Sequence, residues 1–349
     1  MLRYLARKLF YGCLVLLGVV LLIFFLFQGF GDPARLVIGQ TGDSATLNNI
    51  RKELALDQPK SVQLIQYLND VSPIAVHSKS EIASKQLKGW FFGSDDQQFA
   101  IKFPYLRQSY QSKKPVADVL LEALPGTLLL AAAAMLFATV LGIVLGVIAA
   151  TNKDTWMDTG AVFSSVLGIS APSFFMGILI AYLFGFIWHQ YTGLPMTGSL
   201  YETDPFAGRQ LSLRNLILPA LTLGIRPLAI ITQLTRSAML DVLKQDYIRT
   251  AYAKGLSRSK VIWKHALRNA LNPVVTAVTG WFAELLAGAF FVEYIFGWKG
   301  IGKVTVDALE KLDFPVVMGS VLITASGFIM VNMLADWLYG WLDPRIRLQ

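Results

Sequence analysis

The sequence predicts an all-α membrane protein that crosses the bilayer six times. Of its 349 residues, 54% are hydrophobic and only 15% are charged, with a mean hydropathy of +0.50. A soluble domain carries roughly a quarter charged residues, so this much apolar surface requires a non-aqueous environment. The net charge of +8 is spread between apolar runs instead of forming one patch. That distribution argues against nucleic-acid binding and is typical of loops that set membrane orientation.

Six apolar segments approach or exceed the roughly 20 residues that a helix needs to cross a hydrocarbon core about 30 Å thick. The predicted spans are 9–27, 123–151, 159–188, about 215–235, about 273–292 and 314–342. The first three contain no charged residue, whereas each of the others contains one. The basic residues before the first span would also suit a signal peptide. Its apolar run is longer than usual for one and no convincing cleavage site follows, so we expect an uncleaved anchor.

Basic residues in the short loops predict that both termini are cytoplasmic. The segment 236–270 alone contains eight Lys or Arg residues, and the tail adds Arg345 and Arg347. The predicted organisation is an N-terminal anchor helix (1–30), an extracytoplasmic segment (31–115) and a five-helix core (116–349) with a cytoplasmic loop at 236–270. Within 31–115, a helix is expected around 44–70, ended by Ser72-Pro73.

The residues do not indicate an enzyme. The run Gly297-Trp-Lys-Gly-Ile-Gly-Lys303 is close to a phosphate-binding P-loop, but Val304 stands where the motif needs Ser or Thr for Mg²⁺. We expect these glycines to form a turn into a helix around 303–312. The lone Cys13 and three dispersed histidines offer no metal site. The sequence therefore predicts no cofactor bound by this chain.

Arg226 and Glu284 fall near the middle of the fourth and fifth predicted spans. Charged groups in a membrane are costly unless they are paired or hydrated, which makes both residues functional candidates. They could line a water-filled path or pair with each other across helices. The arginine could also extend its charge to the interface.

The cytoplasmic loop has the pattern of two helices meeting at an angle. A short helix is predicted over 246–254, a break at Gly255, and a second helix from Ser257, whose hydroxyl is a good N-cap. Small residues would permit close approach of a partner, while larger apolar ones would anchor it in a helix-in-groove contact. The small residues are Ala251, Ala253 and Gly255, and the anchors are Tyr247, Ile248 and Leu256. The alternative is a solvated basic loop that only sets topology.

This loop resembles the coupling loop, or EAA loop, of binding-protein-dependent ABC importer permeases. The runs Asp246-Tyr-Ile-Arg-Thr-Ala251, Ala253-Lys-Gly-Leu-Ser257 and His265-Ala-Leu-Arg-Asn269 are similar to the dipeptide and oligopeptide branch. Arg249-Thr250-Ala251 occupies the Glu-Ala-Ala positions. Further blocks in the same order are Gly31-Asp-Pro33, Leu54-Ala-Leu-Asp-Gln-Pro59, Leu124-Pro-Gly-Thr127, Leu218-Pro-Ala220, Leu286-Ala-Gly288 and Asp343-Pro-Arg-Ile-Arg347. The stretch 74–105 is longer than the resemblance predicts.

The resemblance implies the type I ABC importer permease fold in a bacterial inner membrane. Its implied partners are a second homologous permease, two cytoplasmic ATPase subunits that hold ATP and Mg²⁺, and an extracytoplasmic binding protein that delivers peptide. The implied ATPase contact comprises Tyr247, Ile248, Arg249, Thr250, Ala251, Ala253, Gly255 and Leu256, with Arg226 and Glu284 as candidates for the translocation path. Relatives of this branch that carry nickel or antimicrobial peptides leave the substrate open. A different class, an ATP-independent secondary transporter or channel, would leave the coupling loop unexplained.

Overall fold

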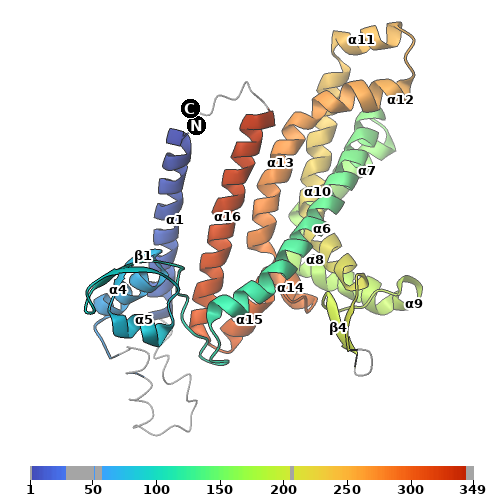
Figure 1. Cartoon of the computed structure of the whole chain (residues 1–349). Coiled ribbons are helices and arrows are strands. Elements are labelled where there is room, and N and C mark those ends of the chain that lie inside the picture. The colour runs from blue at the N-terminus through green and yellow to red at the C-terminus, as the bar shows by residue number, and fades with distance from the viewer. Residues whose placement is uncertain (1, 29–50, 52–56, 205–207, 343–349) are drawn as a thin grey trace. The chain divides into compact units, whose positions relative to one another are not determined.

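We describe a computed structural model of the chain that places residues 2–28, 51, 57–204 and 208–342 (Figure 1). The motif blocks Gly31-Asp-Pro33 and Asp343-Pro-Arg-Ile-Arg347, and most of the predicted helix before Asp57, lie outside these residues. The described chain divides into two compact units. One contains 125–303 and the end of the last helix from 327, and the other contains 2–124 and 304–326.

The described residues contain four helices that are long and apolar enough to cross a membrane. They are α1 (Leu2–Gln28), α6 (Val116–Thr151), α10 (Arg214–Leu243) and α16 (Phe314–Leu342). The predicted class, a helical membrane protein with several spans, is confirmed. The predicted fifth span is the helix α13 (Leu267–Gly288), which is not one of these four. Its polar residues, including Arg268 and Glu284, lower its hydropathy, and the count of six stays a prediction.

The predicted third span, 159–188, is broken. Helix α7 (Trp156–Ser170) is followed by α8 (Ser173–Ile180) and a π-helical segment, η2 (Ala181–Ile187), and the two parts are bent by 109°. The break lies at Ala171, whose ψ of 132° is extended. Pro172 explains it, because proline disfavours a helical conformation in the residue before it and donates no backbone hydrogen bond. The apolar run therefore forms a bent pair that could make a fifth span.

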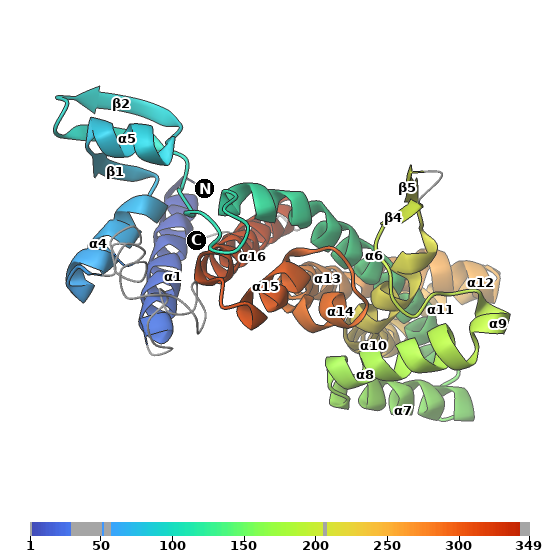
Figure 2. The same ribbon diagram turned by 90° about the horizontal axis from the view of Figure 1, so that it is seen from below.

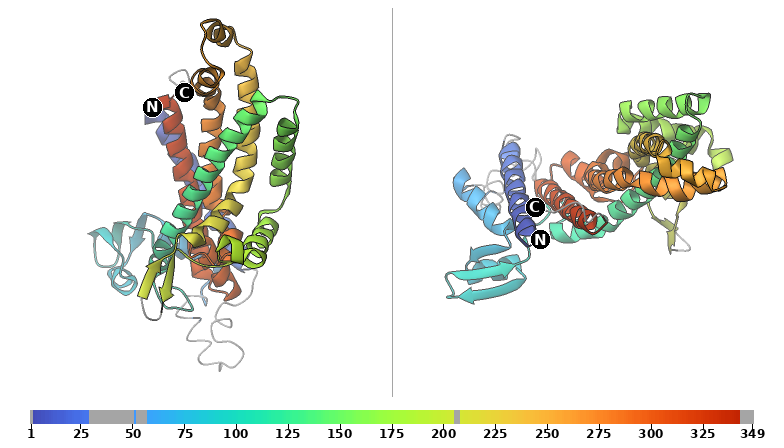
Figure 3. Two further views of the ribbon diagram at one scale, coloured as in Figure 1. Left: turned by 90° about the vertical axis from the view of Figure 1, so that its right-hand side faces the viewer. Right: turned by 90° about the horizontal axis from the view of Figure 1, so that it is seen from above.

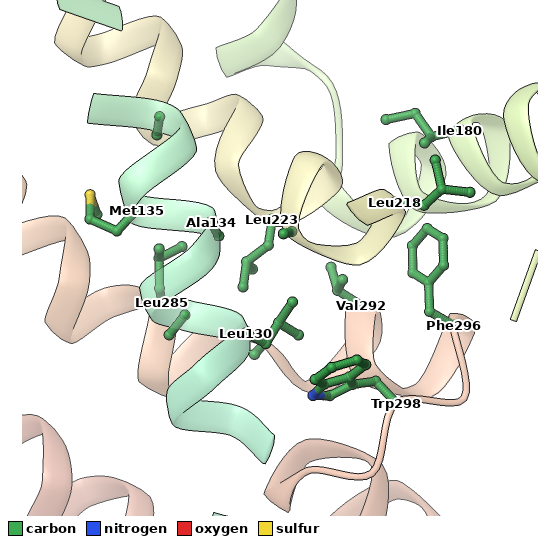
Figure 4. Close-up of a cluster of buried hydrophobic side chains, with 14 of the residues drawn as sticks. Leu130, Ala134, Met135, Ile180, Leu218, Leu223, Leu285, Val292, Phe296 and Trp298 are labelled. Atoms are coloured by element: carbon green, nitrogen blue, oxygen red, sulfur yellow. The ribbon is translucent and has the colours of Figure 1, made fainter. Parts of the chain in front are cut away.

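Small residues allow α6 and α10 to pack closely. A Cβ added at Gly142 would lie 2.8 Å from Cγ2 of Ile231, and one at Gly146 would lie 2.7 Å from the carbonyl oxygen of Thr232. Close backbone approach is what small residues provide between membrane helices. The core beside this contact contains Leu130, Leu218, Val292, Phe296 and Trp298 among its buried side chains (Figure 4).

Short elements connect the long helices that follow α6. A helical turn, α9 (His189–Thr192), precedes a hairpin of β4 (Tyr201–Asp204) and β5 (Gly208–Leu211). Between α10 and α13 lie α11 (Asp246–Ala253), α12 (Arg258–Lys260) and the π-helical η3 (Val261–Ala266). Helix α14 (Phe290–Ile295) follows α13, and a glycine-rich turn leads to α15 (Ile301–Glu310). The helix predicted around 303–312 is thereby confirmed, with both ends two residues earlier.

The segment before α6 contains strands that the all-α prediction did not include. Helix α4 (Lys60–Val71) ends before Ser72, as the Ser-Pro pair predicted. Strand β1 (Ile74–His77), helix α5 (Lys79–Lys85), β2 (Gly89–Gly93) and β3 (Gln98–Lys102) follow, in an antiparallel sheet of order β1-β3-β2. Strands of four or five residues between turns leave little periodicity to detect.

Candidate functional site

The predicted coupling segment comprises α11 and α12. It lies beyond the ends of the long helices α10 and α13. Figures 1 and 3 show α11 displaced from the ends of α10 and α13, with α12 leading back to α13. The predicted helix and its break are confirmed: α11 ends at Ala253, and Gly255 has a φ of +76°. The amide of Leu256 donates to the carbonyl of Ala251, and that of Gly255 donates to Tyr252. These two bonds form a Schellman C-cap, in which a left-handed glycine ends the helix.

Ser257 occupies the N-cap position of α12, as predicted, but its hydroxyl makes no capping hydrogen bond. The predicted hydroxyl cap is therefore wrong, and only its position is right. The Ser257 carbonyl instead accepts from the amide of Val261. A helix of three residues that continues into a π-helical segment gains its order from packing rather than from a cap.

Two of the predicted contact residues face inward. Ile248, only 1% exposed, and Ala251 are buried in a cluster with Val147 of α6 and Met239 of α10. Leu256 is half-buried against the same cluster. In a helix, residues three apart lie on one face, which explains why 248 and 251 are buried together. Ile248 and Ala251 therefore pack against the chain's own core, and their predicted contact with a partner, like that of Leu256, stays a prediction.

The opposite face of α11 is exposed. Arg249, Thr250 and Ala253 all lie on it. Tyr247 is also exposed, and its phenolic oxygen accepts a hydrogen bond from the Asn269 amide over 2.9 Å, which ties α11 to α13. Tyr252, at 44% exposure, is a large side chain that the sequence reading omitted. On a helical wheel of 246–253, Ile248 and Ala251 share one face with Tyr247 and Tyr252 at its edges, and Arg249, Thr250 and Ala253 lie opposite. This pattern was available in the sequence.

Two polar contacts fasten the base of this segment. Arg236, near the end of α10, forms a two-bond ion pair with Asp158 of α7; its Nη2 lies 2.7 Å from Oδ2. Asp158 is buried and also accepts from the backbone amide of Asp154. At the other side of the loop, the Arg258 guanidinium donates to the carbonyl of Thr151, the last residue of α6. The cytoplasmic loop predicted from its charge is thus joined to α6 and α7 by two of its own arginines.

The structure does not bring Arg226 and Glu284 together. Both side chains are exposed on the single chain, and the ion pairs among the described residues include none between them. An exposed charge on a membrane helix must meet water, lipid headgroups or another chain.

The near-P-loop encloses a carboxylate that sequence reasoning missed. Glu293 is fully buried, and its Oε2 accepts hydrogen bonds from the backbone amides of Gly302 (2.7 Å) and Lys303 (3.2 Å). A Cβ at Gly300 would collide with this carboxylate. The amides that face phosphate in a P-loop therefore bind the chain's own glutamate. The paired glycines were the available signal, because they let backbone approach an anion closely.

Helix α6 forms hydrogen bonds with this loop. The Trp298 indole donates to the Gly126 carbonyl over 2.9 Å, and the Ile301 amide donates to Thr127 Oγ1 over 2.8 Å. Glu293 lies outside the candidate spans, and burial raises its pKa from 4.5 to about 7, with hydrogen bonds from Thr127, Lys303 and Gly302 acting in the opposite direction. These hydrogen bonds hold the loop 293–303 against residues 126 and 127 of α6.

The sequence matches two families along nearly its whole length. Residues 142–348 match the family described as "Binding-protein-dependent transport system inner membrane component", and residues 1–131 match the corresponding N-terminal family. The dipeptide transport system permease protein DppB of Escherichia coli (strain K12) is 36% identical, with 99% of each chain covered. The di/tripeptide transport system permease protein DppB of Pseudomonas aeruginosa (strain UCBPP-PA14) is 37% identical, with 100% of each covered.

Two further comparisons extend this set. The glutathione transport system permease protein GsiC of Escherichia coli (strain K12) is 34% identical, with 99% of each chain covered. Among solved structures, a chain of the MetNI methionine ABC transporter in an inward-facing conformation matches with a TM-score of 0.46 and 14% identity. That match covers 64% of this chain and 95% of the other.

Proposed function

Because this chain belongs to the inner-membrane components of binding-protein-dependent transport systems, we propose that it conducts short peptides in an ATP-driven importer. Members of this family are membrane permeases, so the chain is a transport subunit and not itself an enzyme. The substrates in the names of three relatives, a dipeptide, a di/tripeptide and glutathione, are all short peptides. This agreement supports a peptide of two or three residues as the cargo.

The importer contains, besides this chain, a second homologous permease, two ATPase subunits and an extracytoplasmic binding protein. ATP and Mg²⁺ are held by the ATPases. The peptide passes between the two permeases, and Arg226 and Glu284 contribute to that path. Their exposure on the single chain supports this, since a path between two chains is lined by residues that each chain alone leaves open.

The ATPases dock on the outer face of α11, formed by Tyr247, Arg249, Thr250, Tyr252 and Ala253, and we call these residues the docking face. The observation that carries this proposal is the division of α11 into a buried face and an exposed one. A helix anchored behind by Ile248 and Ala251 moves with the core when its exposed face is pulled. ATP can drive that movement only by binding one arrangement of the complex better than the other.

The complex lies in a bacterial cytoplasmic membrane, with both termini of this chain in the cytoplasm. The eight basic residues between 236 and 270 support that orientation, because short cytoplasmic loops are enriched in Lys and Arg. The same orientation places the docking face in the cytoplasm, where ATP is available.

Affinity purification of the tagged chain from its native host tests the proposal. We expect wild-type protein to co-purify with ATPase subunits and a second permease. The double variant Arg249→Glu, Thr250→Tyr should lose the ATPases and keep the second permease, because it reverses a charge and adds bulk only on the docking face. Ser259→Glu, an exposed change on α12, is the matched control and should keep both.

Two outcomes would contradict this function. Retention of ATPases by the double variant would remove the docking face from the contact. Wild-type chain that purifies without any ATPase, and takes up peptide in response to a proton gradient, would indicate a secondary transporter.

A further inference from the structure

One face of the small sheet β1-β3-β2 is apolar and exposed. Its register places Ile74, Ile101 and Trp90 in one row across the three strands, and Val76, Phe99 and Phe92 in the next. All six side chains point to the same side, because residues two apart on a strand share a face. They are between 43% and 71% exposed. Soluble surfaces rarely gather large apolar side chains so densely, so this apolar sheet face requires a partner.

The opposite face of the sheet is already covered. Ala75 and Ala100 lie between these rows and are buried, and Lys102 on the same side is 5% exposed. Figure 2 shows α5 lying across this side of the sheet. The right-hand view of Figure 3, from the opposite direction, shows no described element of the same unit over the apolar sheet face. The unpartnered side is therefore the one that points away from α5.

The same unit fixes the position of the sheet relative to a membrane helix. Phe24 of α1 stacks on Tyr67 of α4, with ring centroids 6.2 Å apart, and Val20 joins their cluster. The candidate span of α1 is Ala6–Leu26, so this contact lies at its C-terminal end. Figure 1 shows α5 on the far side of the sheet from the N-terminal end of α1. The apolar sheet face consequently looks back along α1, toward the bilayer that α1 crosses.

We propose that the apolar sheet face rests on the lipid surface at the membrane boundary where α1 ends. Its composition fits this partner, because tryptophan is enriched at membrane interfaces and Trp90 has a polar N–H for the headgroup region. Lys88, exposed at the approach to β2, can place its charge among lipid phosphates while its stem follows the apolar surface. The sheet then acts as a support that holds α4 and the end of α1 at a fixed depth. This role does not depend on the proposed cargo or on ATPase docking.

Site-directed fluorescence of the full chain, co-expressed with its partner subunits in phosphatidylethanolamine–phosphatidylglycerol nanodiscs, tests the contact. Cys13, the single cysteine, is first changed to serine, and one cysteine is then introduced for an environment-sensitive label. Phe92→Cys places the label on the apolar sheet face, and Ser84→Cys places it on exposed α5 as the control. We expect lipid carrying a doxyl group near the headgroup to quench the label at 92 several-fold more than the label at 84. Aqueous iodide should show the reverse order.

A second measurement uses no fluorescent label, because an apolar label could itself insert into the lipid. Unlabelled Val76→Cys should react several-fold more slowly with a small charged maleimide in nanodiscs than after denaturation, while exposed Ser84→Cys reacts at similar rates in both. Efficient iodide quenching at 92 would show that water covers the face and would overturn the proposal. Protection from both iodide and doxyl lipid would show that protein covers it, which also overturns the lipid assignment. Protection that appears only on adding the binding protein would identify that protein as the occupant instead.

Discussion

Arg236 of α10 and Asp158 of α7 form a two-bond ion pair at the base of the predicted coupling segment, with Nη2 2.7 Å from Oδ2. The carboxylate side chain is 6% exposed and the guanidinium side chain 26%. Arg236 lies ten positions before the start of α11 at Asp246. The pair therefore fixes the helix that carries the coupling segment to the first turn of α7.

Asp158→Asn should destabilise the protein, because it leaves Arg236 partly buried without its counter-charge. Removing one partner of a buried pair costs about 3–5 kcal/mol, and the partial exposure of the arginine lowers the expected loss below this range, to about 2–3 kcal/mol. Thermal unfolding of the detergent-purified chain measures the loss. The control is Asp246→Asn, which removes the exposed pair with Arg249 at 3.6 Å and should change stability by less than about 1 kcal/mol. Equal effects of the two substitutions would contradict the assignment.

The raised pKa of Glu293 predicts a pH dependence of stability. The folded protein binds this proton more tightly than the unfolded chain, so the contribution of Glu293 to stability is fully present below pH 4.5 and is lost as pH rises to about 7. The full span corresponds to about 3 kcal/mol. Glu293→Gln keeps an oxygen for the Gly302 and Lys303 amides and cannot ionise, so it should remove this fall. Unfolding measured from pH 5 to pH 8 tests it, with exposed Glu122→Gln as a control that keeps the wild-type slope.

The glycines around Glu293 should tolerate no side chain. A Cβ at Gly302 would collide with the backbone of Phe290 and lie 2.9 Å from Glu293 Oε2. Gly302→Ala should therefore cost about 1–3 kcal/mol through overpacking. Gly280→Ala is the matched control, since nothing lies within 4 Å of its added Cβ and alanine favours the helix by about 0.5–1 kcal/mol. Thermal unfolding should move in opposite directions for the two variants, and a shared direction would contradict the close packing described here.

Asp70 joins α4 to α5 and to the segments around the β1-β3-β2 sheet, and its loss should loosen this region. Its buried carboxylate accepts from Lys85 at 2.6 Å and from Arg107 at 3.1 Å, while its carbonyl accepts from Lys102. Asp70→Asn leaves these cations without their counter-charge, so limited proteolysis within 60–110 should become faster. Asp95→Asn, which removes an exposed pair with Lys79, is the control and should leave the cleavage rate unchanged. No change in cleavage with Asp70→Asn would mean that apolar packing alone maintains the unit.

Local chemistry explains which features could be predicted from sequence. The break at Gly255 follows from a glycine after a helical pattern, and the end of α4 follows from Ser72-Pro73. Both depend on backbone preferences within a few residues. The break before Pro172 was missed, although the same preference governs it, because the uninterrupted apolar run dominated the assignment of a span.

Features that depend on contacts distant in sequence could not be derived in this way. Glu293 is held by amides 9 and 10 residues later and by Thr127, 166 positions earlier, so its role emerges only when α6 and the loop meet. The exposure of Arg226 and Glu284 depends on the rotation of two helices about their axes. A charge inside an apolar run indicates importance and does not identify its partner.

Gly255 connects the shape of the coupling segment to its proposed function. Its φ of +76° is costly for a residue with a Cβ, by roughly 1–2 kcal/mol, although space around it is open. Gly255→Leu should therefore tilt or fray α11 at its C-cap, reduce peptide uptake strongly and leave membrane insertion intact. Asn adopts this conformation more readily than other residues, so Gly255→Asn should restore most of the uptake. Uptake of labelled dipeptide by cells, normalised to the amount of chain in the membrane, measures both. Full uptake by Gly255→Leu would contradict the coupling role of α11. Equal loss of uptake in both variants would show that uptake does not depend on the backbone conformation of this residue.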